Sequence, residues 1–301
     1  MITNSKTSTQ QRPLAFIETF GCQMNEYDSE RILYYLEQMG YSLTDNREKS
    51  DIIIINTCAV REKAKNRLLG HLGSLKTLKE ARPDILICVG GCTAQSMGGQ
   101  IQRIFPFVDI VFGTHNISEL PVLIEQWTAG KRGICSIISD GFDYDLGKSK
   151  RISSFQALVP IIVGCNNFCS YCMVPYVRGR EKSIEPDRII TNIKEMVSEG
   201  VVEVTLLGQN VNSYGKDPGG GISFSDLLEN VSDITGLKRI RFMTSHPKDF
   251  SPDLVRVIKT RDNIVNHVHL PLQAGSNRIL DKMNRKYTAE QYLDIIENVR
   301  N

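Results

Sequence analysis

Three cysteines lie within eight residues, in the segment Cys165-Asn166-Asn167-Phe168-Cys169-Ser170-Tyr171-Cys172. Neither a helix nor a strand would point all three side chains at one centre, so the spacing C-x3-C-x2-C predicts a loop that gathers thiolates around a metal. Structural zinc sites normally have four protein ligands, and the next four residues offer no fourth cysteine or histidine. Three thiolates on a [4Fe–4S] cluster would leave one iron open to a small chelating ligand. A zinc knuckle that lacks a ligand is the alternative.

The composition is that of a globular protein without membrane segments. The 301 residues suffice for two domains with hydrophobic cores, and 41% hydrophobic and 23% charged residues are ordinary values. No apolar run reaches the length of a membrane span, and the polar residues 1–12 contain no signal-peptide core. We therefore expect a disordered lead-in over residues 1–12, a cytoplasmic location, and cysteines that are ligands or buried thiols rather than disulfides. The net charge of +2 neither requires nor excludes a nucleic-acid partner.

Strand-like apolar segments alternate with helical ones over residues 13–147, which we expect to form a first domain. The expected strands are 14–20, 51–56, 85–89 and 108–112, and the expected helices are 26–39 and 61–80. Four consecutive isoleucines in 51–56 suit a strand that is buried on both faces. This alternation predicts an open parallel α/β sheet.

A cysteine directly follows each of three of these strands: Cys22, Cys58 and Cys92. Parallel strands bring their carboxyl ends to one edge of a sheet, where ligands bind in such folds, so the three thiols can converge. Gly21 and the pair Gly90-Gly91 would allow the backbone to approach closely there. The alternative is that the three are small buried core residues. Cys88, within a strand, and Cys135, in a later extended run, are predicted to be structural.

The polar, glycine-containing segment 140–154 marks the boundary to a second domain over residues 148–301. We expect strand followed by helix four times there. The expected strands are 157–163, 202–207, 239–243 and 265–270, and the expected helices are 186–199, 224–235, 252–259, 276–283 and 289–299. Consecutive βα units predict a parallel barrel or part of one, with its functional edge at the carboxyl ends of the strands.

Polar residues follow several of these strands and are expected to line one cavity: Gly208, Gln209, Asn210, Ser245, His246 and Gln273. Each of them would serve equally well as a loop-capping residue. Three basic residues stand close behind the cysteine loop: Arg178, Arg180 and Lys182. They suit a phosphate-bearing substrate, and a solvated basic turn is the alternative.

The chain resembles the radical S-adenosylmethionine (SAM) methylthiotransferases. The resemblance rests on the segments TFGCQMNEYDSE, INTCAVREKA, GGCTAQ and GCNNFCSYCMVPYVRGREKS, and it extends over essentially the whole chain. The residues Gln23-Met24-Asn25 are similar to the branch that acts on N6-isopentenyladenosine in tRNA. The branch that acts on a ribosomal protein tends to carry a different pair after the first cysteine. The branch that acts on threonylcarbamoyl-adenosine stays an alternative.

This resemblance implies two [4Fe–4S] clusters and SAM as cofactors. One cluster, with the open iron that binds SAM, would be held by Cys165, Cys169 and Cys172, and an auxiliary cluster by Cys22, Cys58 and Cys92. The residues expected around SAM are Tyr171 near the adenine, Gly208, Gln209, Asn210, Ser245 and Gln273. No catalytic side chain is expected beyond the cluster ligands. The implied reaction adds a methylthio group to C2 of N6-isopentenyladenosine at position 37 of tRNA, a carbon whose hydrogen only radical chemistry could remove.

The implied partners are tRNA, a flavodoxin- or ferredoxin-like electron donor and a sulfur donor, and we expect a monomer. Chains of this family continue through about two more βα units and a small β-barrel that helps hold tRNA, so the resemblance implies a truncated chain. A two-cluster electron carrier or inactive scaffold is the non-catalytic alternative, against which the open iron argues. One flat base must lie between the clusters. We therefore expect the two cysteine triads to face each other, roughly 10–20 Å apart.

Overall fold

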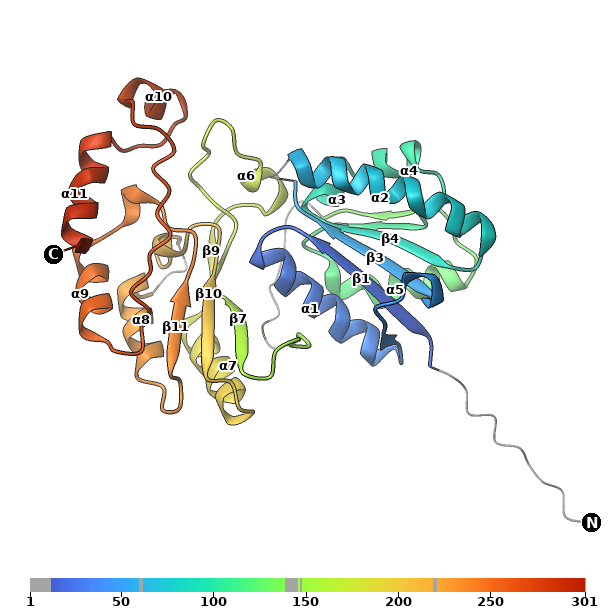
Figure 1. Ribbon diagram of the computed structural model, residues 1–301, viewed down its shortest axis with the longest axis horizontal. Coiled ribbons are helices and arrows are strands. Elements are labelled where there is room, and N and C mark those ends of the chain that lie inside the picture. The colour runs from blue at the N-terminus through green and yellow to red at the C-terminus, as the bar shows by residue number, and fades with distance from the viewer. Residues whose placement is uncertain (1–11, 60–61, 139–145, 147, 219–220, 301) are drawn as a thin grey trace, which may run out of the picture.

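The computed structural model describes residues 12–59, 62–138, 146, 148–218 and 221–300, which form two α/β units side by side (Figure 1). Each unit has its own sheet. The expected lead-in over residues 1–12 lies outside the described residues except for Arg12, and residues 140–145 and 147 of the expected linker lie outside them as well.

The first unit contains a six-stranded sheet in which all strands are parallel, in the order β2-β1-β3-β4-β5-β6. The strands are β1 (Leu14–Phe20), β2 (Ser42–Leu43), β3 (Ile52–Thr57), β4 (Leu86–Gly91), β5 (Ile110–Phe112) and β6 (Ile134–Ser136). The helices are α1 (Gln23–Gln38), α2 (Glu62–Ala81), α3 (Cys92–Met97), α4 (Gln100–Ile104) and α5 (Leu120–Thr128), with short 3₁₀ turns η1 (Arg47–Lys49) and η2 (Ile117–Glu119).

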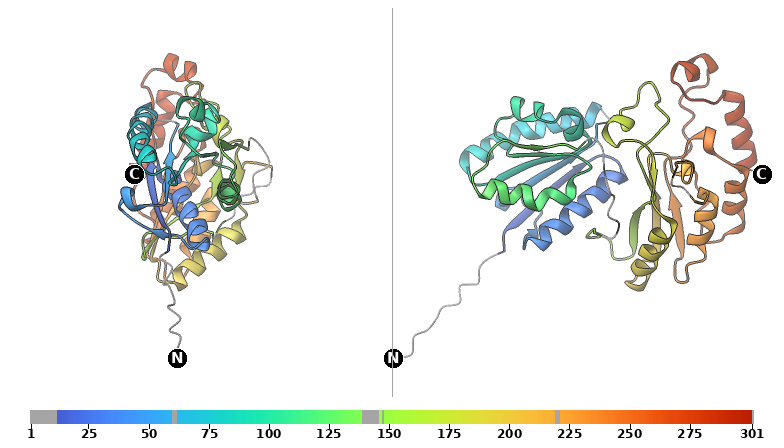
Figure 2. Two further views of the ribbon diagram at one scale, coloured as in Figure 1. Left: turned by 90° about the vertical axis from the view of Figure 1, so that its right-hand side faces the viewer. Right: turned by 180° about the vertical axis from the view of Figure 1, so that it is seen from behind.

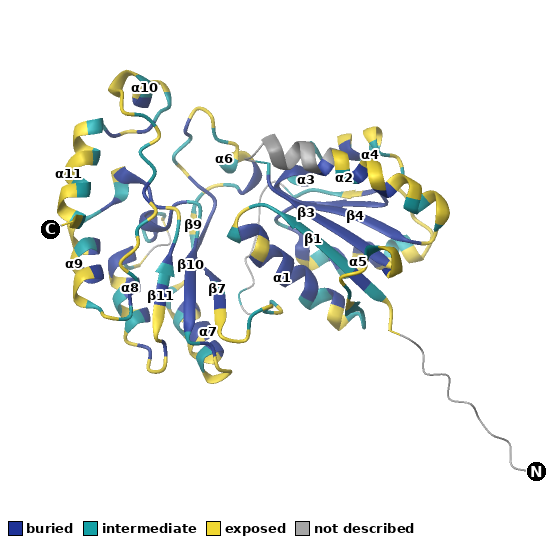
Figure 3. Ribbon diagram, viewed as in Figure 1, coloured by how far each residue is buried: buried dark blue, intermediate teal, exposed yellow. Residues whose placement is uncertain are grey.

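Helices cover both faces of this sheet. The side chains of α1 and α5 pack on one face, and those of α2, α3 and α4 pack on the other. Strands β3 and β4 are therefore buried along their whole length, as the isoleucine run predicts. Figure 3 shows these strands in the colour of buried residues. The expected open parallel α/β sheet is confirmed. Strand β2 was not anticipated, because two residues are too few to show a period. Strand β6 contains Cys135, which was expected in an extended run.

Helix α1 is buried on two sides. Ile32 and Leu36 pack under the first sheet, whereas Met24 and Tyr27 belong to the hydrophobic core of the second unit. Further contacts join the units here, since the backbone N–H of Lys150 donates to the carbonyl of Glu30 at 2.9 Å. The two units therefore share α1 as a common packing element.

The second unit contains a parallel three-stranded sheet in the order β11-β10-β7 and a small antiparallel pair, β8–β9. The strands are β7 (Gln156–Pro160), β8 (Ile162–Val163), β9 (Lys182–Ser183), β10 (Glu203–Leu207) and β11 (Arg239–Phe242). The helices are α6 (Val174–Val177), α7 (Pro186–Ser198), α8 (Phe224–Ser232), α9 (Pro252–Thr260), α10 (Asn277–Lys282) and α11 (Ala289–Arg300), with 3₁₀ turns η3 (Val211–Ser213) and η4 (Pro247–Asp249).

The expected strand over residues 265–270 is not formed. The chain runs beside β11 through one isolated bridge, between Ile240 and Ile264. Directly afterwards the N–H of His267 donates to the carbonyl of Val265, which closes a tight turn and bends the segment out of strand geometry. The segment rejoins its neighbour only where the N–H of Ser245 donates to the carbonyl of His269. The segment therefore lies beside β11 as a fourth strand of the partial barrel would, but it lacks the continuous hydrogen-bond ladder of a strand.

The carboxyl ends of the first sheet's strands point toward α6, which lies between the units in Figure 1 and in the right-hand view of Figure 2. Among the described residues, no helix combines the length and apolarity that crossing a bilayer would require.

Candidate functional site: two cysteine sites near the domain boundary

The loop between β8 and α6 carries the three cysteines of the C-x3-C-x2-C segment: Cys165, Cys169 and Cys172. The first two are 7% and 8% exposed. Gly164, just before the loop, has a φ of 78°, and a Cβ there would lie 2.0 Å from the carbonyl oxygen of Arg180. Only glycine fits this position. The loop then turns through Phe168, whose φ is 46°.

These three thiols lie close enough for their charges to influence one another. Burial raises the pKa of Cys165 to about 11, and the charges of Glu181, Cys172 and Cys169 contribute to the rise. Burial also raises the pKa of Cys172, to which Cys169 contributes. The thiolate is the form that binds metal. Metal binding here would therefore displace protons and would weaken as the pH falls.

The segment that follows α10 grips this loop from the other side. Asn284, in a left-handed conformation with a φ of 55°, donates from Nδ2 to the carbonyls of Asn167 and Phe168 at 3.2 and 2.9 Å. Arg285 donates from Nη1 to the sulfur of Cys169 at 3.1 Å and contacts the hydroxyl of Tyr171 at 3.4 Å. Sequence reasoning missed both residues. An asparagine just after a helix often ends it in a left-handed conformation. That signal predicts a turn, but it does not predict which distant loop the side chain will contact.

The cysteines of the first unit lie where the carboxyl ends of β1, β3 and β4 meet. Cys22 is the N-cap of α1, Cys58 follows β3, and Cys92 begins α3. A Cβ on Gly91 would lie 2.3 Å from the side-chain oxygen of Asn56, and the φ of Gly91 is 88°. A side chain at this position would clash with its neighbours, so the close backbone approach that was expected beside these cysteines requires glycine at residue 91.

Two of these thiols, Cys22 and Cys58, are in contact. A hydrogen bond with Cys58 is the main cause that lowers the pKa of Cys22 to about 6, and Arg178 and the first backbone N–H groups of α1 lower it further. Cys58 and Cys92 are buried, whereas Cys22 is exposed. Thr93, the residue after Cys92, joins the segments of Cys92 and Cys58, because its hydroxyl donates to the carbonyl of Cys58 at 3.0 Å.

Arg178 connects this site with the second unit. Its Nε donates to the sulfur of Cys92 at 3.3 Å, and its Nη2 donates to Asp28 at 2.6 Å. The structure therefore gives Arg178 buried partners in the first unit instead of the expected place in a phosphate-binding surface. Arg180 and Lys182 are exposed, and the guanidinium of Arg180 lies 4.3 Å from the ring centroid of Phe168.

Several polar atoms at the carboxyl ends of β10 and β11 are buried and have no hydrogen-bond partner among the residues that the structure describes. They are Oε1 of Gln209, Oδ1 of Asn210, Oγ of Ser245, Nε2 of His246 and Nε of Arg285. Such groups are destabilising unless a ligand or water satisfies them. Sequence analysis anticipated the first four, and Arg285 joins them from the far end of the chain. Gly208 begins this region at the end of β10. Gln273, by contrast, is exposed, with a left-handed φ of 71°.

The donor chemistry of both cysteine sites fits iron–sulfur clusters, which proteins hold through cysteine thiolates. Each site offers three cysteines in segments that follow strands. Within the described part of the chain, no group of three or more His, Cys, Asp or Glu side chains is arranged to hold one metal ion.

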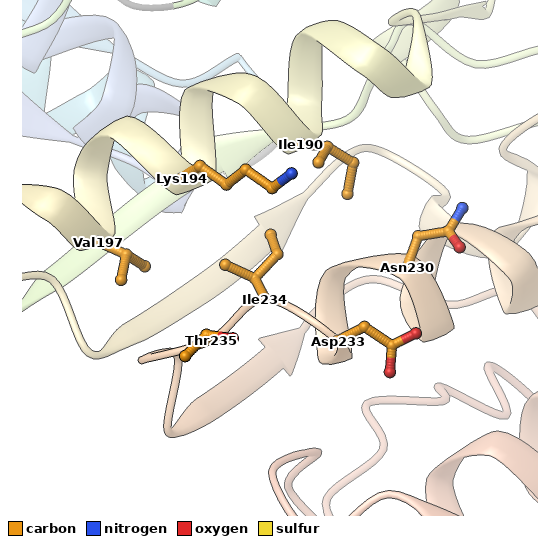
Figure 4. A pocket seen from close by; sticks show the side chains of 7 residues that line it. All are labelled: Ile190, Lys194, Val197, Asn230, Asp233, Ile234 and Thr235. Carbon is orange, nitrogen blue, oxygen red and sulfur yellow. The ribbon is translucent and has the colours of Figure 1, made fainter.

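The cavity in Figure 4 is separate from these sites. It has a volume of about 410 Å³ and lies between α7 and the segment after α8, with Lys194 and Asp233 among its lining residues. Val197 and Thr235, at its edge, stand just before β10 and β11, at the amino ends of the strands. Residues at that end of βα units usually serve stability.

Comparison with known proteins assigns the two units to two families. Residues 14–113 match the "Uncharacterized protein family UPF0004", and residues 159–301 match the "Radical SAM superfamily". A structural relative is the radical S-adenosylmethionine methyltransferase TsrM from Kitasatospora setae with cobalamin and a [4Fe–4S] cluster bound, with a TM-score of 0.64 over 96% of this chain and 65% of that one. At 13% identity this likeness concerns the fold alone.

Curated relatives are far more similar in sequence. The protein named tRNA-2-methylthio-N(6)-dimethylallyladenosine synthase from Desulforamulus reducens is 50% identical over 291 residues, covering 95% of this chain and 64% of the relative. Proteins of the same name from Thermoanaerobacter pseudethanolicus and Clostridium beijerinckii are 51% and 48% identical and are covered to 61% and 66%. The chain thus spans slightly less than two thirds of the length of these relatives. The two family models match one unit each, and the relatives of about 50% identity extend over both units. The chain therefore belongs to the radical SAM methylthiotransferase family.

Proposed function

We propose that this chain is the cluster-bearing part of an enzyme that adds a methylthio group to C2 of N6-isopentenyladenosine at position 37 of tRNA. The observation that supports this most is the presence of two separate three-cysteine sites, with Arg178 of the second unit donating a hydrogen bond to Cys92 of the first across the domain boundary. The names of the relatives support the same substrate.

Cys165, Cys169 and Cys172 would hold one [4Fe–4S] cluster, and Cys22, Cys58 and Cys92 the other. When bound, the first cluster supplies the electron that cleaves SAM, and the second supplies the sulfur site. The chain itself holds the thiolates in place. Arg285 donates to the sulfur of Cys169, and Gly164 lets the loop pass beside the carbonyl of Arg180.

The buried polar atoms near β10 and β11 suit the amino-acid end of SAM. Oε1 of Gln209 and Oδ1 of Asn210 can accept hydrogen bonds from an ammonium group. His246 accepts the N–H of Lys248 at Nδ1, at 3.2 Å, so its remaining proton is on Nε2. That N–H can donate to a carboxylate together with Oγ of Ser245 and Nε of Arg285. The acceptors thus suit the ammonium group of SAM, and the donors suit its carboxylate.

Two further parts of the proposal concern the substrate and the partners. Arg180 and Lys182 are exposed near the cysteine loop and suit the phosphates of tRNA. Tyr171, 50% exposed, suits stacking on the adenine of SAM. We further propose a cytoplasmic monomer that takes electrons from a flavodoxin- or ferredoxin-like protein and sulfur from a donor.

The test uses protein reconstituted with iron and sulfide without air, reduced, and given SAM and tRNA that lacks the methylthio group. The tRNA is then digested and its nucleosides are weighed. The proposal expects 2-methylthio-N6-isopentenyladenosine, and no such product from the variant Cys165→Ala/Cys169→Ala/Cys172→Ala. Parallel reactions contain threonylcarbamoyl-adenosine tRNA or a ribosomal protein.

The products separate the alternatives. Formation of 5′-deoxyadenosine with methylthiolation only of one of the other substrates would move the enzyme to another branch of the family. Absence of 5′-deoxyadenosine from fully reconstituted, reduced protein would favour a non-catalytic two-cluster protein.

A further inference from the structure

Arg178 belongs to the radical SAM unit by sequence but to the N-terminal cysteine site by contact. It stands six positions after Cys172, directly behind α6, and α6 packs against α3. Its side chain reaches into the first unit, where Nε donates to the sulfur of Cys92 at 3.3 Å. Because six residues of chain span at most about 20 Å, this arginine couples the two cysteine triads over a short path.

The guanidinium fixes two of the elements that carry cysteines. Cys92 is the first residue of α3, and Asp28, the second partner of Arg178, lies on α1, whose N-cap is Cys22. The planar fork of arginine donates in two directions at once, which a lysine ammonium on a single point cannot reproduce with the same geometry. One side chain therefore sets α1 relative to α3 at the end where their cysteines lie.

Docking alone does not explain this pair. The side chains of Arg178 and Asp28 are 3% and 0% exposed. A buried ion pair is typically no more stabilising than apolar side chains of the same volume. The boundary already has apolar packing from Met24 and Tyr27, and a hydrogen bond from the hydroxyl of Thr114 to the carbonyl of Val177 at 2.8 Å. What the charged side chain of Arg178 adds to this packing is a hydrogen bond to the sulfur of Cys92.

We propose that Arg178 is a positioning residue of the N-terminal cysteine site. It holds the sulfur of Cys92 and makes both the iron affinity and the reduction potential of a cluster on Cys22, Cys58 and Cys92 depend on the docked radical SAM unit. The proposal rests on the proposed function in taking these cysteines as cluster ligands. A cationic donor at a ligand sulfur stabilises the reduced, more negative cluster, so its loss lowers the potential.

The test is made in full-length protein with Cys165→Ala, Cys169→Ala and Cys172→Ala, so that only the N-terminal site can hold a cluster. Arg178→Gln alone would strand the buried carboxylate of Asp28 and endanger folding. The double variant Asp28→Asn/Arg178→Gln removes both charges together. We expect it to fold, to bind iron about 10–100-fold more weakly in chelator competition, and to show a more negative midpoint potential in a redox titration followed by EPR.

Two matched variants separate the sulfur contact from docking. Thr114→Val removes the neighbouring hydrogen bond between the units but leaves Arg178 in place, and it should leave the potential unchanged. Arg178→Lys keeps the charge and should restore part of the shift. The proposal is overturned if the double variant has the parental potential and iron affinity, or if Thr114→Val shifts them equally.

These measurements need neither SAM nor tRNA, so a failed methylthiolation assay does not decide them. If the parental triple variant holds no iron although it is folded, the proposed cluster ligands are wrong, and the proposal falls with them.

Discussion

His246 is the buried titratable side chain whose charge state matters most for the proposed SAM site. Burial, followed by the charge of Arg285, lowers its pKa from 6.5 to about 3. The imidazole is therefore neutral at any pH at which the protein works. Its Nδ1 accepts the N–H of Lys248, which leaves Nε2–H as a donor without a partner. A neutral donor of fixed tautomer is suited to binding a carboxylate without pH dependence of its own.

This pKa predicts how stability depends on pH. Between pH 6.5 and 3 the unfolded chain binds a proton at His246 and the folded chain does not, so the free energy of unfolding falls as the pH falls. The contribution is about 1.4 kcal/mol per pH unit, or about 2 kcal/mol between pH 6.5 and 5. His246→Asn keeps an acceptor for the N–H of Lys248 and cannot titrate. Urea unfolding of both metal-free proteins at the two pH values should show a smaller loss in the variant, and equal losses would refute the buried neutral state.

At the scale of elements, the turn behind α10 acts as a strap on the cysteine loop. The N–H of Ser170 donates to the carbonyl of Met283 at 3.2 Å, and its hydroxyl donates to that of Lys282 at 2.9 Å. Together with the two bonds from Asn284 and the contacts of Arg285, these hydrogen bonds hold the loop that carries Cys165, Cys169 and Cys172. A helix that is distant in sequence thereby sets the geometry of these ligands.

Two substitutions at Asn284 test the strap. Asn284→Gly keeps the left-handed backbone but removes the two amide bonds, and Asn284→Ala removes both features. In a background with Cys22→Ala, Cys58→Ala and Cys92→Ala, both should release iron to a chelator several-fold faster than the parent, because second contacts orient metal ligands. The alanine variant should also lose about 1–2 kcal/mol more in free energy of unfolding, from backbone strain at positive φ. Release at the parental rate from the glycine variant would contradict the strap.

On the scale of the whole molecule, the two cysteine sites belong to different α/β units, each with its own glycine-containing loops. We therefore predict about eight iron atoms per reconstituted chain, four for each cubane. Cys165→Ala/Cys169→Ala/Cys172→Ala should retain about half, since the other site does not depend on these ligands. Cys88→Ala and Cys135→Ala are the controls and should retain all, because Cys88 lies within β4 and Cys135 within β6. Loss of all iron from the triple variant, or of half from either control, would refute the ligand assignment.

Much of the fold could be predicted because the decisive patterns are local. The isoleucine run of β3 and the amphipathic period of α7 each report the burial of neighbouring residues along one element. The expected strand over residues 265–270 was wrong because a strand also needs a partner of matching direction, and the turn between Val265 and His267 prevents a ladder. Its apolar composition carried no information about that turn.

The sequence by itself determined that six cysteines are grouped in threes and predicted the strand ends that bear them, since spacing along one chain is enough for each. Tertiary structure alone decided which charges meet those sulfurs. Arg178 contacts Cys92 across 86 positions, and Arg285 contacts Cys169 across 116. In sequence, an arginine behind a cysteine loop fits an exposed phosphate site and a buried ion pair equally well. Only the packing of α1, α3 and α6 at the domain boundary distinguishes them, because burial depends on which elements dock and not on the residue's neighbours in the chain.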